Sequence, residues 1–424
     1  MKRFLILALI LFTNLNLYCQ NFKVLFIGNS YTYVNNLPQA IADIANAMGD
    51  TFSFDSNTPG GYTLNLHTSN ATTLSKINAQ PWDFVVLQEQ SQLPSFDPIQ
   101  VSVDVYPYAR ELDSLILVND SCTETFFYMT WGRQNGDMSN CGTYPPVCTY
   151  NGMQQRLRDS YLQMSIGNNA SVSPVGVAWK LFRDAFPGIN LYQPDESHPS
   201  IYGTYLAACV FYTSFYHKSS VGCSFITPGI SALEGLAIQT IASSTVLDSI
   251  STWQGNGDVP IPSYTYSALG NMIQFNNSSS NSASYSWDFG DGNSSNFENP
   301  QNTYSVDGQY FVTLTASTNC LSYSFTDTIF VNASGVLNLS NTFSVNVFPN
   351  PVTNQICIYF ENNLPQDVEL SVYNSLGSLV LKEYYNSQSY IKMNVEELSS
   401  GLYTLILNNG SPQIVSRKII INKL

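Results

Sequence analysis

The chain has 424 residues, of which only 11% are charged, and its formal net charge is −14. An acidic chain whose 16 Lys and Arg are scattered is not expected to bind nucleic acid or an anionic membrane surface, because both require clustered basic side chains. The length suggests about two to four domains, and the many Tyr, Phe and Gly residues are typical of an extracellular protein rich in β structure.

The N-terminal residues have the pattern of a secretory signal peptide. Lys2 and Arg3 precede the apolar run FLILALILF, which is too short to span a bilayer. We expect cleavage after Cys19, which makes residues 1–19 the signal peptide. Lipid modification of Cys19 is the alternative, and the bulky Tyr18 before it argues against that. No other stretch is long and apolar enough to predict a transmembrane segment.

Eight cysteines are present, and seven remain after removal of the signal peptide. At least one therefore stays unpaired in a monomer. Outside the cytoplasm, Cys141 and Cys148 could close the loop CGTYPPVC, and Cys209 with Cys223 is a second candidate pair. No CxxC or Cys/His cluster suggests zinc, so no metal site is predicted.

The first predicted strand leads to a candidate nucleophile. Val24 to Ile27 form an apolar run too short for a helix, which predicts a strand buried on both faces of a parallel sheet. Gly28-Asn29-Ser30 follows, and residues 37–49 then have helical apolar spacing. This order places Ser30 at the carboxyl edge of the sheet, where open α/β folds bind ligands. Taken alone, the triplet is also typical of an ordinary turn or helix cap.

Further strands and helices alternate up to about residue 252. Such alternation predicts a parallel sheet covered by helices on both faces. The strands predicted after the first are Thr51–Asn57, Asp83–Ser91, Thr123–Trp131 and Ser171–Trp179, and helices are predicted over 107–118, 153–164 and 180–186.

A second candidate for catalysis lies near the end of this region. Asp195 and His198 are three residues apart, just before an apolar helix that begins near Ile201. A carboxylate can hold an imidazole ring so that its other nitrogen faces outward. The alternative is a helix cap followed by an exposed histidine. Because the chain has only three histidines, few candidates exist for a general base.

These segments together resemble the SGNH, or GDSL-like, hydrolase superfamily. In that family the nucleophilic serine follows the first strand, as Gly28-Asn29-Ser30 does here with Asn in place of the usual Asp. The family's DxxH block is matched by Asp195 and His198, and Gly61 stands where its oxyanion-hole glycine is expected. The resemblance implies an α/β fold with a three-layer αβα, flavodoxin-like parallel sheet for residues 20–252.

One block departs from the family pattern. The family supplies an asparagine to the oxyanion hole after the third strand, but here the chain reads Leu87-Gln88-Glu89-Gln90-Ser91. Gln90 falls on the family's Asn position by register, and Gln88 is the alternative. A glutamine amide can donate to an oxyanion, but its extra methylene changes its reach.

The resemblance also implies a role for each residue. Ser30 would attack an ester carbonyl after His198 removes its proton, and Asp195 would orient His198. The amides of Ser30 and Gly61, with one Gln side chain, would form the oxyanion hole. This chemistry requires neither a metal nor an organic cofactor.

Two residues near this site are candidates for substrate binding. His67 follows Gly61 in the segment LNLHTSN, and the alternative is a polar surface histidine. Trp131 ends a predicted strand at the same sheet edge and could line the pocket.

Residues 253–335 are expected to contain a linker, GNGDVPIPS, and a small β-sandwich. The motif Trp287-Asp288-Phe289-Gly290-Asp291-Gly292 and the later strand VTLT resemble the PKD module, which we expect to be a spacer or an aid to polymer binding. Asp288 and Asp291 do not provide a full set of oxygen ligands for calcium, so we expect a structural turn.

Residues 336–424 are expected to contain a second small β-sandwich. The segments FPNPV, VYNSLGSLV and LSSGLYTL resemble the C-terminal sorting domain of the type IX secretion system of Bacteroidota. This resemblance implies export through the periplasm by the type IX secretion machinery, then release or attachment at the outer cell surface. The alternative is a small adhesive β-domain.

The sequence therefore predicts a secreted, modular serine esterase of SGNH type. The expected partner is an ester substrate, and the family together with the extracellular address favours an acetylated polysaccharide or glycan. A lipase or thioesterase would use the same chemistry. The alternative from another class is a non-catalytic surface carbohydrate-binding protein or adhesin that retains the hydrolase fold, which the missing Asn favours.

Overall fold

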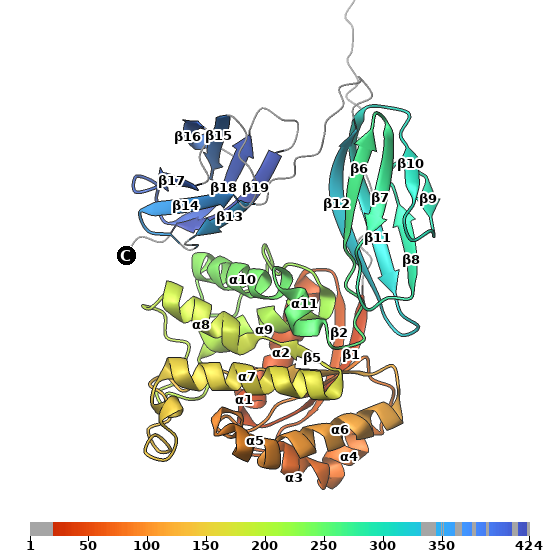
Figure 1. Ribbon diagram of the computed structural model, residues 1–424. Helices are drawn as coiled ribbons and strands as arrows, with labels where there is room; N and C mark the ends of the chain where they lie inside the picture. Colours follow the sequence, from red (N-terminus) through yellow and green to blue (C-terminus); the bar gives the residue numbers. More distant parts are fainter. Residues whose placement is uncertain are drawn as a thin grey trace, which may run out of the picture.

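The computed structural model describes residues 20–331, 345–348, 350, 352–360, 367–374, 379–386, 390–408 and 414–421 (Figure 1). The predicted signal peptide, residues 1–19, lies outside the described residues. The predicted domain boundaries at residues 252 and 335 stay predictions.

One five-stranded parallel sheet forms the centre of the first part of the chain, as predicted (Figure 1). Its strand order is β2-β1-β3-β4-β5, so the chain leaves β1 in one direction and later returns to its other side. The carboxyl ends of β1 and β3 therefore flank the point where the order reverses, which is where such sheets bind ligands. The bounds are β1 Asn21–Ile27, β2 Thr51–Asn57, β3 Phe84–Leu87, β4 Glu124–Tyr128 and β5 Ser171–Ser173.

Helices cover both faces of this sheet and confirm the three-layer αβα arrangement. One face is packed by α1 Ser30–Tyr33, α2 Leu37–Ala47, α8 Val175–Ala185, α9 Ile201–Tyr216 and α10 Ala232–Leu247. The other is packed by α3 Leu64–Thr68, α4 Ala71–Ile77, α5 Pro98–Asp104, α6 Tyr106–Asn119, α7 Tyr150–Asn168 and α11 Ile250–Gln254. Three short 3-10 helices lie in the loops: η1 Val34–Asn36, η2 Leu93–Ser95 and η3 Pro145–Cys148.

The fifth strand is shorter than its sequence suggests. We expected a strand over Ser171–Trp179, but β5 ends at Ser173 and α8 begins at Val175. Pro174 lies between them, and its fixed φ suits the entry to a helix. The apolar residues that follow Pro174 therefore face the core from a helix and not from a strand.

Two antiparallel sheets make up the PKD-like sandwich, in the orders β10-β7-β6 and β12-β11-β8-β9. Their strands are β6 Tyr264–Leu269, β7 Met272–Asn277, β8 Ser284–Asp288, β9 Ser294–Ser295, β10 Gln301–Thr303, β11 Gly308–Ser317 and β12 Ser322–Val331. Trp287 and Phe275 are buried between the sheets. The carboxylates of Asp288 and Asp291 accept hydrogen bonds from the Gly290 and Asn293 amides, which fits the expected structural turn.

The described residues from 345 onward also form two antiparallel sheets, in the orders β13-β14-β17 and β16-β15-β18-β19. The strands are β13 Val345–Phe348, β14 Gln355–Phe360, β15 Asp367–Tyr373, β16 Leu379–Asn386, β17 Tyr390–Asn394, β18 Gly401–Asn408 and β19 Ile414–Ile421. Alternate apolar residues of both sheets meet in one core, as expected of a second sandwich.

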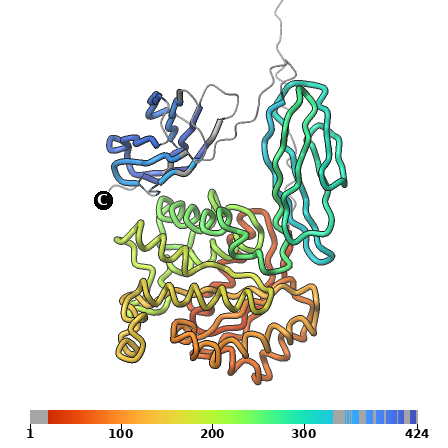
Figure 2. Tube along the Cα trace, in the orientation of Figure 1, coloured from red at the N-terminus to blue at the C-terminus, as the bar shows by residue number. Residues whose placement is uncertain are grey.

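The segment predicted as a linker packs against the amino edge of the parallel sheet. In Figure 2 the chain can be followed through this segment, where the colour changes from green to teal. The buried Glu124 carboxylate accepts hydrogen bonds from Ser171 Oγ at 2.6 Å and from the Asp258 amide at 3.2 Å. A Cβ on Gly257 would lie 2.0 Å from Glu124 Oε1, so only glycine fits this passage.

The PKD-like sandwich is fastened to the same amino edge. A disulfide joins Cys122, just before β4, to Cys320, in the turn between β11 and β12. Tyr323 is fully buried, its hydroxyl donates to the Phe215 carbonyl at 2.7 Å, and its ring stacks on His217 with centroids 3.9 Å apart. The two domains therefore share buried side chains.

The cysteine predictions have mixed outcomes. The disulfide between Cys141 and Cys148 is present, as expected. The suggested pairing of Cys209 with Cys223 is wrong, because both are buried free thiols. Cys209 lies within α9, an apolar helix buried on all sides, where a thiol packs as a small apolar side chain.

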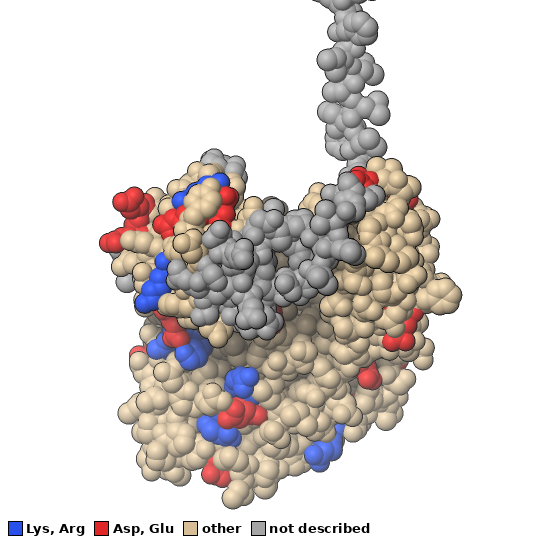
Figure 3. All heavy atoms as spheres, turned by 45° about the horizontal axis from the view of Figure 1, so that its top comes forward, with Lys and Arg blue, Asp and Glu red and all other residues tan. Residues whose placement is uncertain are grey.

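Most of the face shown in Figure 3 is uncharged, and its Lys and Arg side chains lie mainly in the left part of the view, with Asp and Glu among them. No helix among the described residues is both long and apolar enough to cross a membrane.

Candidate active site

The turn after β1 presents Ser30 as the first residue of α1. Asn29 caps the helix, since its Oδ1 accepts a hydrogen bond from the Tyr31 amide at 3.2 Å. A Cβ on Gly28 would lie 2.6 Å from Gln88 Oε1, so the tight approach of this turn to β3 requires glycine. Asn in place of the family's Asp therefore still makes the local cap.

The structure brings Ser30, His198 and Asp195 together at the carboxyl edge of the sheet. His198 Nε2 lies 2.8 Å from Ser30 Oγ, and His198 Nδ1 is hydrogen-bonded to Asp195 Oδ2. The Ser197 and His198 amides donate to Asp195 Oδ1 at 3.1 and 3.0 Å. A hydroxyl, an imidazole and a carboxylate in this order form the arrangement that activates a serine nucleophile.

Asp195 stays ionised under ordinary conditions. Partial burial alone would raise its pKa, but the hydrogen bonds from His198 and from the neighbouring amides outweigh burial and lower the pKa. The His198 and Asp195 side chains are 30% and 47% exposed. The candidate catalytic residues thus lie at an open surface and not in a deep tunnel.

Aromatic side chains hold the loop that carries His198. Tyr31, Trp131 and Trp179 stack in series, with ring centroids 4.8 and 3.8 Å apart. Trp131 Nε1 donates to the Ser197 carbonyl at 3.0 Å, and the Tyr31 hydroxyl lies 2.6 Å from Ser197 Oγ. Trp131 is fully buried, so it does not line a pocket as expected and instead supports the loop that carries His198.

Two backbone amides are available for an oxyanion. Among the described residues no acceptor faces the amide of Ser30 or of Gly61. Gly61 has a positive φ of 72° in an exposed turn, and the next carbonyl, of Tyr62, accepts a hydrogen bond from Asn29 Nδ2 at 2.8 Å. That bond ties the Gly61 turn to the residue before Ser30.

The two candidate glutamines differ in what their amides contact. Gln88 is fully buried, its Oε1 accepts from the Asn29 amide at 2.8 Å, and its Nε2 donates to Asn29 Oδ1 and to the Glu89 carbonyl. Gln88 is therefore used to build the Ser30 turn. Gln90 Nε2 has one contact among the described residues, with Gln92 Oε1 at 3.2 Å, which leaves one N–H.

His67 is neither a surface histidine nor placed to contact a substrate. It is fully buried, with Nδ1 2.7 Å from Thr73 Oγ1 and Nε2 2.8 Å from the Gly28 carbonyl. Both ring nitrogens are thus occupied within the protein. The expectation failed because α3 and α4, which enclose His67, are too short and polar to give a periodic signal.

Sequence reasoning also missed Tyr31, Ser197 and Glu89, all next to residues that it selected. Glu89 is buried at the end of β3, and its carboxylate accepts from the amides of Leu64 and Gln90. Its position within LQEQS was a signal, because an acidic side chain directly after a buried strand needs partners.

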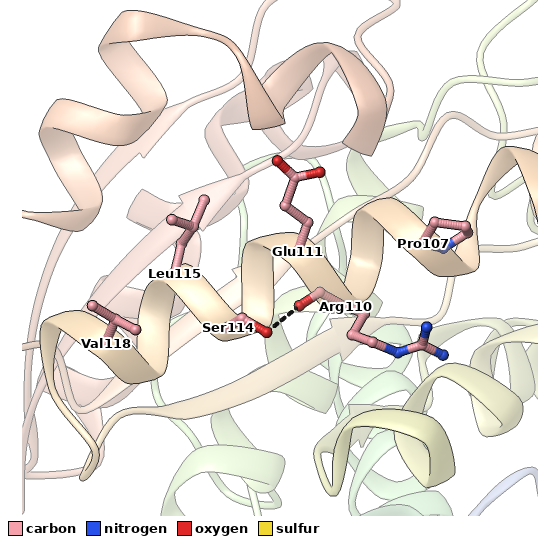
Figure 4. A pocket seen from close by; sticks show the side chains of 6 residues that line it. All are labelled: Pro107, Arg110, Glu111, Ser114, Leu115 and Val118. Atoms are coloured by element: carbon pink, nitrogen blue, oxygen red, sulfur yellow. Dashed lines mark hydrogen bonds between the residues drawn. The ribbon is translucent and has the colours of Figure 1, made fainter.

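A shallow hollow also lies on the outer side of α6, away from this site. Figure 4 shows Pro107, Arg110, Glu111, Ser114, Leu115 and Val118 around it. It contains none of the residues discussed above. Within the part of the chain that the structure describes, no cluster of three His, Cys, Asp or Glu side chains could hold a metal ion.

Family models match the later parts of the chain. The model described as a PKD domain matches residues 260–331, and the model described as a secretion system C-terminal sorting domain matches residues 346–422. Both predicted domains are thereby confirmed. The sorting domain, of the type IX system, indicates export followed by secretion or attachment at the cell surface. No curated protein matches the chain.

Solved structures similar to the α/β part include SGNH-type proteins. A DUF4886 family protein from Bacteroides uniformis is 20% identical over 54% of this chain and 95% of that chain, with a TM-score of 0.47. A candidate SGNH hydrolase from Slackia heliotrinireducens is 23% identical over 45% of this chain and 97% of that chain, with a TM-score of 0.38. The PKD1 domain of a Vibrio cholerae metalloprotease is 33% identical over 18% of this chain and 98% of that chain, with a TM-score of 0.17.

Proposed function

We propose that this chain is a secreted serine esterase of SGNH type that removes acyl groups, acetyl above all, from a polysaccharide or glycan. The observation that carries the proposal is the line of hydrogen bonds from Ser30 Oγ through His198 to Asp195. Its position at the carboxyl edge of the sheet, where Ser30 is accessible beside a half-exposed His198, supports the same role.

In the proposed first step, His198 Nε2 takes the proton of Ser30 as Oγ attacks the ester carbonyl carbon. Asp195 holds Nδ1–H and stabilises the imidazolium. The tetrahedral intermediate then collapses, the alcohol leaves with the proton from His198, and the acyl group remains on Ser30. Water, activated by His198 in the same way, releases the carboxylic acid and restores Ser30.

The negative oxygen of that intermediate needs donors. The amides of Ser30 and Gly61 and the remaining N–H of Gln90 are the proposed donors, because each lacks another acceptor among the described residues. Gln88 is not proposed, since its donors are committed to Asn29 and Glu89. Loss of one donor typically lowers kcat about a hundredfold or more.

The exposure of the site supports a polymeric substrate. A half-exposed Asp195 and His198 can be reached by an ester on the side of a large chain, which a deep pocket would exclude. The sorting domain places the protein outside the cell or on its surface, where such polymers occur. These two observations favour an acylated glycan over a small intracellular thioester.

The test uses purified residues 20–424 with a short-chain chromogenic acetate and an acetylated polysaccharide. We expect turnover by the wild type and a loss of about 10⁴-fold or more in kcat for Ser30→Ala and for His198→Ala. Ser114→Ala, an exposed serine on α6, is the matched control and should retain full activity. A wild type no faster than Ser30→Ala on every acetate and glycan would reject the esterase and favour the binding protein.

A further inference from the structure

Glu89 lies between the two loops that supply the proposed oxyanion hole, and the proposed mechanism does not use it. Its side chain is fully buried. Oε1 accepts from the Gln90 amide at 2.5 Å and from the Leu64 amide at 3.2 Å, while Oε2 accepts from the Leu64 amide at 3.1 Å. One carboxylate therefore joins two backbone segments that are 25 residues apart in sequence.

The first of these segments carries Gly61. Leu64 begins α3, three residues after Gly61, and Thr63 caps that helix. The turn before it is tied to Asn29 through the Tyr62 carbonyl. The two anchored groups, the Tyr62 carbonyl held by Asn29 and the Leu64 amide held by Glu89, thus lie one and three residues after Gly61.

The second segment carries Gln88 and Gln90. Glu89 binds the Gln90 amide directly, and the Glu89 carbonyl accepts from Gln88 Nε2. The Gln88 side chain in turn accepts from the Asn29 amide, next to Ser30. All three proposed oxyanion donors are therefore linked to Glu89 by short paths of neighbouring residues and hydrogen bonds.

We infer that Glu89 is a positioning residue for the oxyanion hole, in which its ionised carboxylate fixes the Gly61 turn and the Gln90 segment relative to Ser30. This inference rests on the proposed esterase function. It adds a residue that touches neither the nucleophile nor the substrate but sets the separation of the donors. Since a displacement of about 1 Å can cost a hundredfold in rate, such a residue has a kinetic effect.

Both groups that contact Glu89 are donors, and the ionised carboxylate accepts from both without presenting a donor of its own. A glutamine would present an NH₂ group to one of the amides that now donate to Glu89, and two donors cannot bond each other. Burial raises the pKa of Glu89 to about 8, and the hydrogen bonds from the Gln90 and Leu64 amides oppose this rise. The titratable group that faces it among the described residues is Tyr161 of α7, whose own pKa burial raises.

Glu124 provides a matched control. It is also buried, burial raises its pKa to about 8 as well, and its carboxylate also accepts a hydrogen bond from a backbone amide, that of Asp258. It lies at the amino edge of the sheet, at the start of β4, whereas Glu89 follows the carboxyl end of β3. Glu124→Gln therefore perturbs folding in a similar way without changing the oxyanion hole.

The experiment compares Glu89→Gln, Glu124→Gln, Ser30→Ala and the wild type in the full chain, by steady-state kinetics on a neutral acetate from pH 6 to pH 9. We expect Glu89→Gln to lower kcat about tenfold to a hundredfold with KM changed less than about threefold. Wild-type kcat should rise as Glu89 ionises near pH 8, and this rise should be absent in Glu89→Gln and present in Glu124→Gln.

The outcomes separate the inference from the function that it extends. If the wild type and Ser30→Ala are equally inactive, the esterase itself is rejected. If the wild type is active and Glu89→Gln matches it, or loses no more than Glu124→Gln, the positioning role is rejected alone. If Glu89→Gln is slower but keeps the rise near pH 8, the requirement for the ionised form is rejected. Circular dichroism and urea unfolding confirm that each variant compared is folded.

Discussion

The disulfide between Cys122 and Cys320 links the PKD-like sandwich to the α/β domain, and its removal would show how much this link stabilises the protein. It joins residues 198 apart in sequence. A cross-link stabilises a fold mainly by restricting the unfolded chain, and the chain-entropy relation gives about 5 kcal/mol for a loop of this length. We expect Cys122→Ser with Cys320→Ser to lose about this much free energy of unfolding and to lower Tm by about 10–20 °C.

Esterase activity at 25 °C should survive this change. The disulfide and Tyr323 lie at the amino edge of the sheet, while Ser30 lies beyond the carboxyl end of β1. The hydrogen bond and ring stacking of Tyr323 remain in the double variant and should keep the sandwich attached. A variant that is less stable but equally active would therefore separate attachment from catalysis.

The assay is thermal and urea unfolding without reductant, with the second disulfide as control. Cys141 and Cys148 are only seven residues apart, for which the same relation gives about 2 kcal/mol. We thus expect the pair Cys141→Ser, Cys148→Ser to lose clearly less stability than the first pair. Equal losses, or no loss in the first pair, would refute the view that the long disulfide stabilises both domains as one unit.

Two further predictions concern Tyr31 and His217. Tyr31→Phe removes the hydroxyl that contacts Ser197 Oγ. This change should lower the free energy of unfolding in urea by about 1 kcal/mol and kcat by about fivefold. An unchanged kcat would show that this contact does not hold the His198 loop. Burial lowers the pKa of His217 to about 4, although its hydrogen bond to Gln254 opposes this shift. As the pH falls, the His217 imidazole therefore binds a proton in the unfolded chain before it does so in the folded protein. Stability should therefore decline from pH 6.5 to pH 4 by on the order of 3 kcal/mol, and His217→Asn, which tolerates the positive φ of 52° there, should flatten that decline.

The sequence predicted the strands and the turn that carries Ser30 more accurately than the other parts of the candidate site. β2 was predicted to its exact residues, and the run from Val24 to Ile27 lies within β1. Ser30 was expected at the carboxyl edge of the sheet because it follows a buried strand. The contact with His198, 168 residues away, was implied by the resemblance to SGNH hydrolases and not by the strand pattern.

Burial and long-range pairing could not be predicted in the same way. His67 looked polar because its neighbours are polar, but the Gly28 carbonyl and Thr73 enclose it from distant positions. The partner of Cys122 was not predictable either, since it depends on docking between two domains. Gln88 was the alternative to Gln90 as an oxyanion donor, and only its contacts with Asn29 reveal a structural role.

The arrangement separates attachment from catalysis along the strand direction. The PKD-like sandwich and the segment before it are attached at the amino ends of the strands, through the Cys122 disulfide, the Glu124 carboxylate and the Tyr323 side chain. Ser30 and His198 lie at the carboxyl ends of the strands, next to the Gly61 turn and to the aromatic side chains that hold the His198 loop. The accessory domain is therefore docked at the edge opposite to the proposed catalytic residues. The same separation explains why the two buried acids Glu89 and Glu124 are expected to differ. Glu89 holds loops that bear the proposed oxyanion donors, whereas Glu124 holds the segment that connects two domains.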